Sequence, residues 1–518
     1  MPAPREAATT PPAVALRHIH KRFGALQANR DVQLVVRAGT VHGIVGENGA
    51  GKSTLMSILY GLQQPDAGAI EIGGRAVRIR GPRDAIALGV GMVHQHFMLA
   101  DRLSALDNVM LGAEPGFRLG PARARVRAAL DALMQRTGLA VDLDAAVDAL
   151  PVGARQRLEI LKALHRGARI LILDEPTAVL TPQETAQLFG VLRQLRAQGT
   201  TVLLITHKLK EILALADHVT VLRQGAVVFD GPIGATSLDG LAEAMVGRRV
   251  DLGRDAHAAA PGAVRLEARG LTWTDPLGVV RLDDVSLQLR AGEIVGVAGV
   301  AGNGQGELLD ALAGLLAPQR GTLALAGREF TPRRWLDPAT ARHLRLAHVP
   351  EDRQRRGLVL PFAAWESSVL GYQRQPRYDR GGWLRGRVMR RDCAAMMERY
   401  DVRPRDPLLP SGRFSGGNQQ KLVLAREARL HDAGPQVLLV GQPTRGVDIG
   451  AIEFIHRRLR ALRDGGGALL VVSSELDEIL ALADRVLVMH AGRIAGELAI
   501  AQCSEQSLGR LMAGVALH

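Results

Sequence analysis

Residues 41–55 read VHGIVGENGAGKSTL, and this stretch decides the fold. Val41 to Val45 form an apolar run with the length of a buried strand, and the residues from Gly46 to Ser53 fit the pattern G-x-x-x-x-G-K-S, with a helix expected from about Ser53. Glycines at these positions let backbone N–H groups close around phosphate oxygens, and the helix N-terminus adds a favourable dipole. The stretch predicts a phosphate site formed by Gly46, Asn48, Gly49, Gly51, Lys52, Ser53 and Thr54, with Lys52 on the β- and γ-phosphates and Ser53 on Mg²⁺.

Two acidic residues follow another apolar run farther along the chain. Ile170 to Leu173 have strand length, and Asp174-Glu175 come directly after them. A carboxylate at the end of such a strand can hold Mg²⁺ through water, as in P-loop ATPases. The adjacent carboxylate is placed to polarise the attacking water. We therefore expect Asp174 to bind the metal and Glu175 to be the general base.

Three further side chains are candidates for the same site. His207 follows the apolar strand from Thr201 to Ile205 and can reach the γ-phosphate. Gln95 follows a short apolar stretch and can contact Mg²⁺ or the water, and Phe23 precedes the first strands and is a candidate for stacking on adenine. The expected catalytic residues are thus Glu175, His207 and Gln95, and the expected metal ligands are Ser53, Gln95 and Asp174.

The chain contains two copies of one domain. Five segments recur in the same order, and each copy alternates β-branched runs with Ala/Leu/Arg-rich helical stretches, the pattern of a parallel sheet covered by helices. Residues 120–165 lack any strand-like run and predict a helical subdomain. The matched pairs are 41–55 with 293–309, VHQ (93–95) with VPE (349–351), 150–164 with 414–428, ILILDEPTAVLT (170–181) with VLLVGQPTRGVD (437–448), and 203–225 with 470–492.

Composition excludes several classes of protein. The chain has 518 residues and two cysteines, too few for a disulfide framework or a four-cysteine zinc site. No apolar run approaches the ~20 residues of a membrane-spanning helix, and the N-terminus has no apolar core for a signal peptide. The formal charge of +13 leaves open nucleic acid, an anionic membrane surface or a merely solvated surface. We expect a chain that is soluble and stays where it is made.

With these motifs, nearly the whole chain resembles the tandem ATP-binding subunit of an ABC importer. SGGNQQ (415–420) resembles the ABC signature, Asp448 resembles the D-loop aspartate, and HQHFML (94–99) and GNGQ (302–305) are similar to the nucleoside branch of the simple-sugar and nucleoside importers. The resemblance implies two RecA-like α/β domains, each with a helical subdomain, packed head to tail. Each ATP then lies between one domain's phosphate loop and the other domain's signature, here Ser415, Gly416 and Gly417.

The second copy departs from the family at its phosphate loop and the first copy at its signature. Pro151-Val152-Gly153-Ala154 stands where the second copy has Ser415 to Asn418, and Pro151 lacks the hydroxyl and the N–H that a γ-phosphate would use. All the changes fall on one of the two composite sites, so we expect one hydrolytic and one degenerate site. In the second copy, Gln305 replaces the lysine, Gly306 the Mg²⁺-binding hydroxyl residue, Gly441 the aspartate, Gln442 the glutamate and Ser474 the histidine.

The resemblance implies an ATPase that couples ATP and Mg²⁺ to import, with separate permease subunits and an extracytoplasmic solute-binding protein, at the cytoplasmic face of the membrane. Nucleosides are the expected solute, and simple sugars such as ribose or galactose are the alternative. A soluble tandem ATPase on ribosomes or DNA and a regulatory pseudo-ATPase are disfavoured, and no nucleic acid is expected. The expected divisions are a disordered tail (1–12), a first nucleotide-binding domain (13–250), a linker (251–262) and a second domain (263–518).

Overall fold

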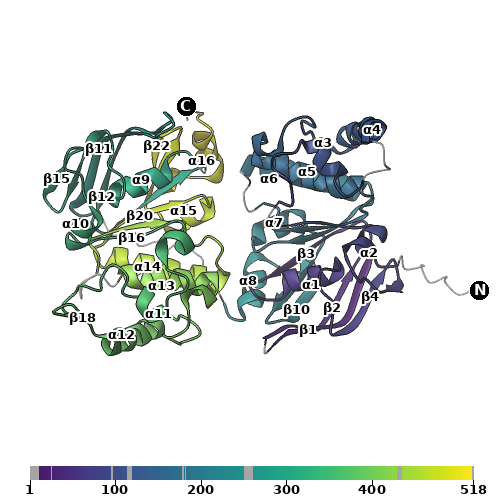
Figure 1. Ribbon diagram of the computed structural model, residues 1–518, viewed down its shortest axis with the longest axis horizontal. Helices are drawn as coiled ribbons and strands as arrows, with labels where there is room; N and C mark the ends of the chain where they lie inside the picture. The colour runs from purple at the N-terminus through teal and green to yellow at the C-terminus, as the bar shows by residue number, and fades with distance from the viewer. Residues whose placement is uncertain are drawn as a thin grey trace, which may run out of the picture. The chain divides into compact units, whose positions relative to one another are not determined.

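The computed structural model describes residues 11–24, 26–94, 97–113, 119–177, 180, 182–249, 261–300, 302–428 and 434–515. The chain forms two compact units, residues 1–250 and 251–518. Each unit contains one four-stranded antiparallel sheet and one six-stranded sheet with helices (Figure 1). The repeat in the sequence is therefore also a repeat of architecture.

In the first domain the phosphate-loop strand lies in the middle of the six-stranded sheet. The order is β10-β9-β3-β8-β7-β6, with only β10 antiparallel to its neighbour. Central parallel strands are covered on both faces and therefore read as continuous apolar runs, and every residue of β3 is buried. The strands are β3 (Val41–Gly46), β6 (Val90–Val93), β7 (Ile170–Asp174), β8 (Thr201–Ile205), β9 (His218–Arg223) and β10 (Ala226–Pro232).

The antiparallel sheet of the first domain has the order β2-β1-β4-β5. Its apolar residues share one core with β3 and the first helix. The remaining elements are β1 (Val14–Phe23), β2 (Leu26–Val36), β4 (Ala67–Ile72), β5 (Arg75–Val77), α1 (Lys52–Leu59), α2 (Pro82–Ala87), α3 (Ala105–Met110), α4 (Leu119–Thr137), α5 (Val152–His165), α6 (Pro182–Ala197), α7 (Leu209–Leu215) and α8 (Leu238–Val246). Helices α4 and α5 agree with the helical subdomain expected at 120–165, and α3 lies before that range.

The second domain repeats this topology, with sheet orders β12-β11-β14-β15 and β16-β19-β20-β13-β21-β22, and adds the hairpin β17-β18. Its strands are β11 (Val264–Thr274), β12 (Val280–Arg290), β13 (Glu293–Gly299), β14 (Arg320–Leu325), β15 (Arg328–Phe330), β16 (Leu346–Val349), β17 (Asp379–Arg380), β18 (Trp383–Leu384), β19 (Val437–Gly441), β20 (Ala468–Ser473), β21 (Arg485–His490) and β22 (Arg493–Ala499). Its helices are α9 (Gln305–Leu312), α10 (Pro338–His343), α11 (Ala364–Ser367), α12 (Gly386–Arg399), α13 (Gly416–Ala428), α14 (Ile449–Asp464), α15 (Leu476–Leu482) and α16 (Glu505–Met512).

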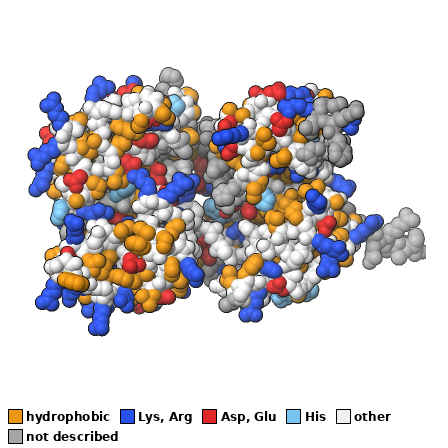
Figure 2. Space-filling view, in the orientation of Figure 1, with side chains coloured by type: hydrophobic (Ala, Val, Ile, Leu, Met, Phe, Trp, Pro, Cys, Tyr) orange, Lys and Arg blue, Asp and Glu red, His pale blue; other side chains and the backbone are white. Residues whose placement is uncertain are grey.

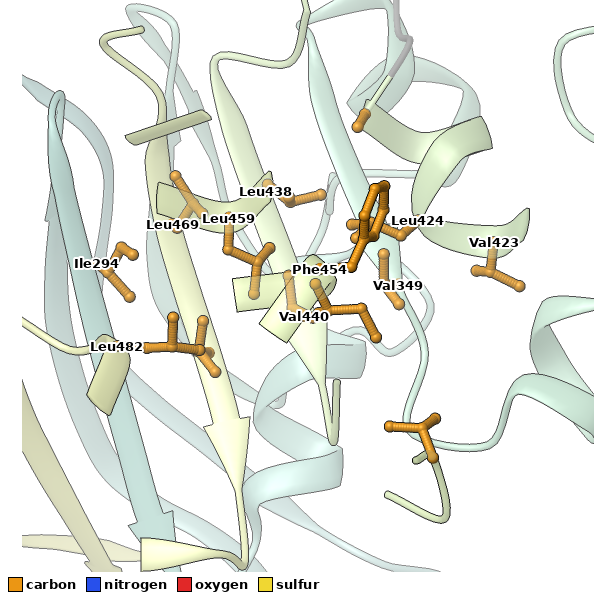
Figure 3. Packing of buried hydrophobic residues seen from close by; sticks show 14 of the residues in the cluster. Ile294, Val349, Val423, Leu424, Leu438, Val440, Phe454, Leu459, Leu469 and Leu482 are labelled. Carbon is orange, nitrogen blue, oxygen red and sulfur yellow. The ribbon is translucent and has the colours of Figure 1, made fainter. Parts of the chain in front are cut away.

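The core of the second domain lies on both faces of its six-stranded sheet. Val295 and Val297 of β13 face the antiparallel sheet, whereas Ile294 and Ala298 face the helices, as the two-residue period of a strand requires. Figure 3 shows the helical side, where Val349 at the end of β16 belongs to the same buried cluster as the residues of α13 and α14. The sheet and the signature helix α13 are thus joined by apolar packing.

Three expectations drawn from the composition and the chain organisation can be compared with the structure. Lys and Arg side chains are spread over the visible face of both units and mingle with acidic ones, rather than forming one block (Figure 2). Within the described ranges, no helix has both the length and the apolar character needed to cross a membrane. The linker expected at 251–262 lies almost wholly outside the described residues, as does most of the tail expected at 1–12.

Candidate active site

The phosphate loop of the first domain connects β3 to α1. Gly49 and Gly51 have φ angles of 82° and 99°, a left-handed conformation that glycine adopts without steric cost. A Cβ added at Gly46 would lie 2.3 Å from the carbonyl oxygen of Leu222, and one at Gly51 would lie 2.3 Å from that of Ala28. The helix begins at Lys52, one residue before the expected Ser53. The glycines of the motif are therefore required by backbone geometry in this chain.

Lys52 lies inside the loop. Its Nζ donates to the carbonyl oxygens of Gly46 at 2.6 Å and Glu47 at 3.0 Å, and the side chain is buried. Burial lowers the pKa of Lys52, while the nearby carboxylates of Glu175, Asp174 and Glu47 raise it. The ammonium is thus held inside the loop, where the charge of a phosphate group would offset its desolvation.

Asp174 and Ser53 come together at the carboxyl edge of the sheet. Asp174 is the last residue of β7 and is buried. Burial raises the pKa of Asp174 and the charge of Glu175 raises it further, whereas a hydrogen bond with the Ser53 hydroxyl and the charge of Lys52 lower it. A hydroxyl and a carboxylate are hard oxygen ligands of the kind that Mg²⁺ binds in phosphate sites. These two residues fit the metal that the sequence predicts.

Glu175 and His207 form a hydrogen-bonded pair. The Nδ1 atom of His207 lies 2.9 Å from Oε1 of Glu175, and because a carboxylate can only accept, Nδ1 carries the proton. Burial alone would raise the pKa of Glu175, but the hydrogen bond and charge of His207 and the charges of Lys52 and Lys208 outweigh it and hold this pKa below its ordinary value. Glu175 is therefore an ionised carboxylate oriented by His207.

The loop that carries His207 is held by residues that sequence reasoning missed. The Thr177 hydroxyl donates to the buried Glu211 carboxylate at 2.7 Å, and Thr206 donates to the same carboxylate at 3.4 Å. Thr206 also accepts a hydrogen bond from the backbone N–H of Lys208 at 3.0 Å. The repeat itself offered a signal, since Glu478 occupies the position in the second copy that matches Glu211.

The second domain keeps the backbone of this site but not its chemistry. Gly304 has the same φ of 99° as Gly51, and the Gln305 amide donates to the Val300 carbonyl at 3.1 Å, the contact that Lys52 makes with Glu47. Gln442 has a φ of 47° against 48° for Glu175, and it accepts hydrogen bonds from Ser474. The degenerate site therefore retains its fold while lacking the lysine and the paired carboxylates.

The two signatures begin their helices differently. Ser415 directly precedes α13, and its hydroxyl accepts a hydrogen bond from the Asn418 side chain at 2.9 Å. Pro151 precedes α5 and makes no side-chain cap. Asp448 caps α14 through the N–H of Ala451 at 2.8 Å, and its Oδ2 would lie 3.1 Å from a Cβ at Gly417. Only the second domain presents a hydroxyl at the first residue of the signature.

The remaining residues predicted for the site lie at different positions relative to the phosphate loop, and one of them is outside the described residues. Phe23 is the last residue of β1 rather than a residue before the first strands; it is 43% exposed and remains a candidate for adenine stacking. Asn48 and Gly49 are exposed in the phosphate loop, and Thr54 lies in the first turn of α1. Gln95 lies outside the described residues. The structure thus brings together Lys52, Ser53, Asp174, Glu175 and His207 within the first domain.

Comparison with known proteins agrees with this architecture. A family model described as ABC transporter matches residues 29–178 and 282–445, one match in each domain. The nucleoside import ATP-binding protein NupA of Lactococcus lactis is 44% identical over 96% of this chain and 97% of its own length. The guanosine import ATP-binding protein NupO of Bacillus subtilis is 43% identical over 97% of each chain.

A relative named for a sugar is nearly as similar. The ribose import ATP-binding protein RbsA 2 of Streptomyces avermitilis is 41% identical over 96% of this chain and 96% of its own length. All three relatives match across both domains, so the tandem arrangement is common to them and to this chain. This chain belongs to the ABC transporter family, as a tandem ATP-binding protein of the group that includes these nucleoside and sugar import ATPases.

Proposed function

We propose that the chain hydrolyses ATP at one composite site and thereby drives the import of nucleosides. The observation that supports this most strongly is the division of chemistry between the domains. Lys52, Asp174 and Glu175 meet in the first domain, and the second domain keeps the hydroxyl of Ser415. In this proposal, the first phosphate loop and the second signature act on the same ATP.

Binding would rest on the phosphate loop of the first domain. Its backbone N–H groups, the N-terminus of α1 and Lys52 supply positive charge for the β- and γ-phosphates. Ser53 and Asp174 would hold Mg²⁺, which neutralises phosphate charge when bound. Phe23 remains the candidate for the adenine ring.

Hydrolysis would rest on the Glu175–His207 pair. Glu175 accepts a proton from the attacking water, and its lowered pKa keeps the carboxylate ionised at neutral pH. His207 holds this carboxylate in place through its Nδ1 proton. Ser415 and the N–H groups at the start of α13 would donate to the γ-phosphate as charge develops on it.

A paired substitution tests the composite site. Ser415→Arg should silence hydrolysis because it fills the γ-phosphate space, and losing such a donor alone typically costs about 10²–10³ in kcat. Pro151→Arg, the matched control in the other signature, should spare most activity because it faces a loop without a lysine. The measurement is steady-state phosphate release with the permease subunits present. Equal inactivation of both variants would show that both signatures serve hydrolysis.

The solute and the partners extend the proposal. We assign nucleosides because two relatives named for nucleoside or guanosine import are 44% and 43% identical, against 41% for the ribose relative. The chain would work at the cytoplasmic face of the membrane, with integral-membrane permease subunits and an extracytoplasmic solute-binding protein. Proteoliposomes holding the whole assembly should take up labelled nucleosides on addition of ATP. Uptake of labelled ribose instead would establish the sugar alternative.

A further inference from the structure

The degenerate site of the second domain is filled by a glutamate from its own chain. Glu351 follows β16 and occupies the position that matches Gln95 of the first domain. A Cβ added at Gly441 would lie 2.5 Å from Cγ of Glu351, and one added at Gly306 would lie 3.4 Å from its Oε2. These two glycines replace Asp174 and Ser53. The Glu351 side chain therefore takes the space of the lost aspartate and lies within van der Waals contact of the position of the lost serine.

The residues after Glu351 reach the signature of the same domain. They form the π-helical turn η3 (Arg353–Gly357), which Asp352 caps through the N–H groups of Gln354 and Arg355. The Arg353 guanidinium donates to the carbonyl oxygen of Arg445 at 2.6 Å and to that of Gly446 at 3.5 Å. Both carbonyls belong to the loop that leads to Asp448. The turn is thus bonded to the D-loop.

The same guanidinium lies against the first glycine of the signature. A Cβ added at Gly416 would lie 2.5 Å from Nη2 of Arg353, so the side chain of any other residue would displace it. The first domain carries Val152 at this position, in its altered signature. Gly416 and the Arg353 that contacts it therefore both belong to the second domain, whose signature is intact.

Two further bonds join the turn to the helix that the signature begins. The Gln354 side chain donates to that of Gln419 at 3.2 Å, and Arg426 donates to the carbonyl of Gly357 at 2.8 Å. Val349, just before this segment, packs in the same buried cluster as Val423 and Leu424 of α13 (Figure 3). The segment is consequently joined to α13 through Gln354 and Gly357, and Val349 of the preceding strand packs in the same cluster as α13.

We infer that residues 351–357 form a brace that has converted the degenerate site into a support for the intact signature. Glu351 anchors the brace in the space of the lost aspartate, and Arg353 holds Gly416 and the D-loop where they act on ATP. Arg353 is a positioning residue, since it acts through the signature. The inference rests on the composite site proposed above.

The test compares Arg353→Ala with Arg355→Ala in the full assembly. Arg355 lies in the same turn, but its side chain is 89% exposed, so its loss should leave hydrolysis unchanged. Arg353→Ala should lower kcat about 10- to 100-fold, because small misplacements of catalytic groups cost this much. KM for ATP should change less than about threefold, because the phosphate loop that binds ATP is in the other domain.

Three further measurements separate the possible failures. ATP binding to Glu175→Gln should be the same with and without Arg353→Ala, which a general loss of folding would not allow. Arg353→Lys keeps the charge but not the planar fork, so it should give an intermediate kcat.

If the alanine variant does not fold, a lysine variant with wild-type kcat overturns the brace. If Ser415→Arg is silent and Arg353→Ala is fully active, the brace is wrong and the composite site stands. If Ser415→Arg is active, the composite site itself is wrong.

The role of Glu351 as the anchor of the brace is tested by the substitution Gly441→Asp. This change restores the aspartate that the family's motif contains, yet its Cβ would collide with Glu351. We expect kcat to fall, with little change in KM, although the substitution improves the match to the motif. A wild-type or raised kcat would show that Glu351 supports nothing.

Discussion

Glu175→Gln is the most discriminating change at the proposed base, because the molecule already contains its structural control. Gln442 occupies the matching position with the same backbone conformation, a φ of 47° against 48°. Its N–H donates to Val472 at 2.7 Å, as that of Glu175 donates to Ile205 at 2.8 Å. A glutamine therefore fits this backbone, and the substitution removes basicity without removing shape.

The expected loss follows from the role of a general base. Removing proton transfer costs about 10²–10⁴ in rate, which is roughly 2.7–5.4 kcal/mol of barrier at 1.36 kcal/mol per decade. Stability should change by at most ~1 kcal/mol, since the His207 hydrogen bond can be kept by the amide oxygen. ATP should still bind, because Lys52 and the loop are untouched.

The assay is single-turnover and steady-state phosphate release, with binding of a fluorescent ATP analogue as the companion measurement. Gln442→Glu, the reverse change in the second domain, should alter kcat less than about twofold. An active Glu175→Gln enzyme would refute the assignment of the base. Comparable losses from both substitutions would refute the one-site model.

Three other changes give clear outcomes. Lys52→Ala should abolish hydrolysis by removing the charge-assisted phosphate contact, and normal turnover with the permease present would contradict the site. Gln305→Lys should not create a second active site, because Gly306 and Gly441 remain; doubled turnover per chain would contradict this. His42 is buried, and burial lowers its pKa from 6.5 to about 4. The neutral form therefore stabilises the first domain above pH 6.5, and this stability is lost as the pH falls toward 4, at up to about 1.4 kcal/mol per pH unit. His42→Asn should flatten that dependence in equilibrium unfolding, and an unchanged slope would contradict it.

The sequence predicted the central features of the first site because they are local. A phosphate loop is defined by glycines and a lysine that are adjacent in the chain, and the run from Ile170 to Leu173 ends where its carboxylates are needed. Parallel strands bring such ends to one edge of a sheet, and Asp174, Glu175 and His207 lie together there, while their roles in hydrolysis stay predictions. The degenerate residues of the second copy followed from the repeat.

The residues that escaped prediction act over longer distances. Glu211 supports His207 through Thr177 and Thr206, and nothing in a single copy of the pattern distinguishes it from a solvated helix residue. The repeat matches Glu351 to Gln95. Its place beside Gly306 and Gly441 depends on the π-helical turn that follows, and no periodicity in the sequence predicts such a turn. The sequence shows that the metal ligands are missing at Gly306 and Gly441. Only the packing shows that the Glu351 side chain lies beside these positions.

The position of Glu351 also constrains how this protein can evolve. A lineage that regained the aspartate at Gly441 by one mutation would place its Cβ 2.5 Å from Cγ of Glu351 and 2.9 Å from its backbone nitrogen. Shortening Glu351 would relieve only the first of these contacts, so the backbone would also have to shift before the aspartate fitted. Placing an aspartate at position 441 thus requires at least two changes, one in the Glu351 side chain and one in the backbone that carries it. A single substitution at Gly441 is therefore not expected to give the second domain the aspartate site of the first.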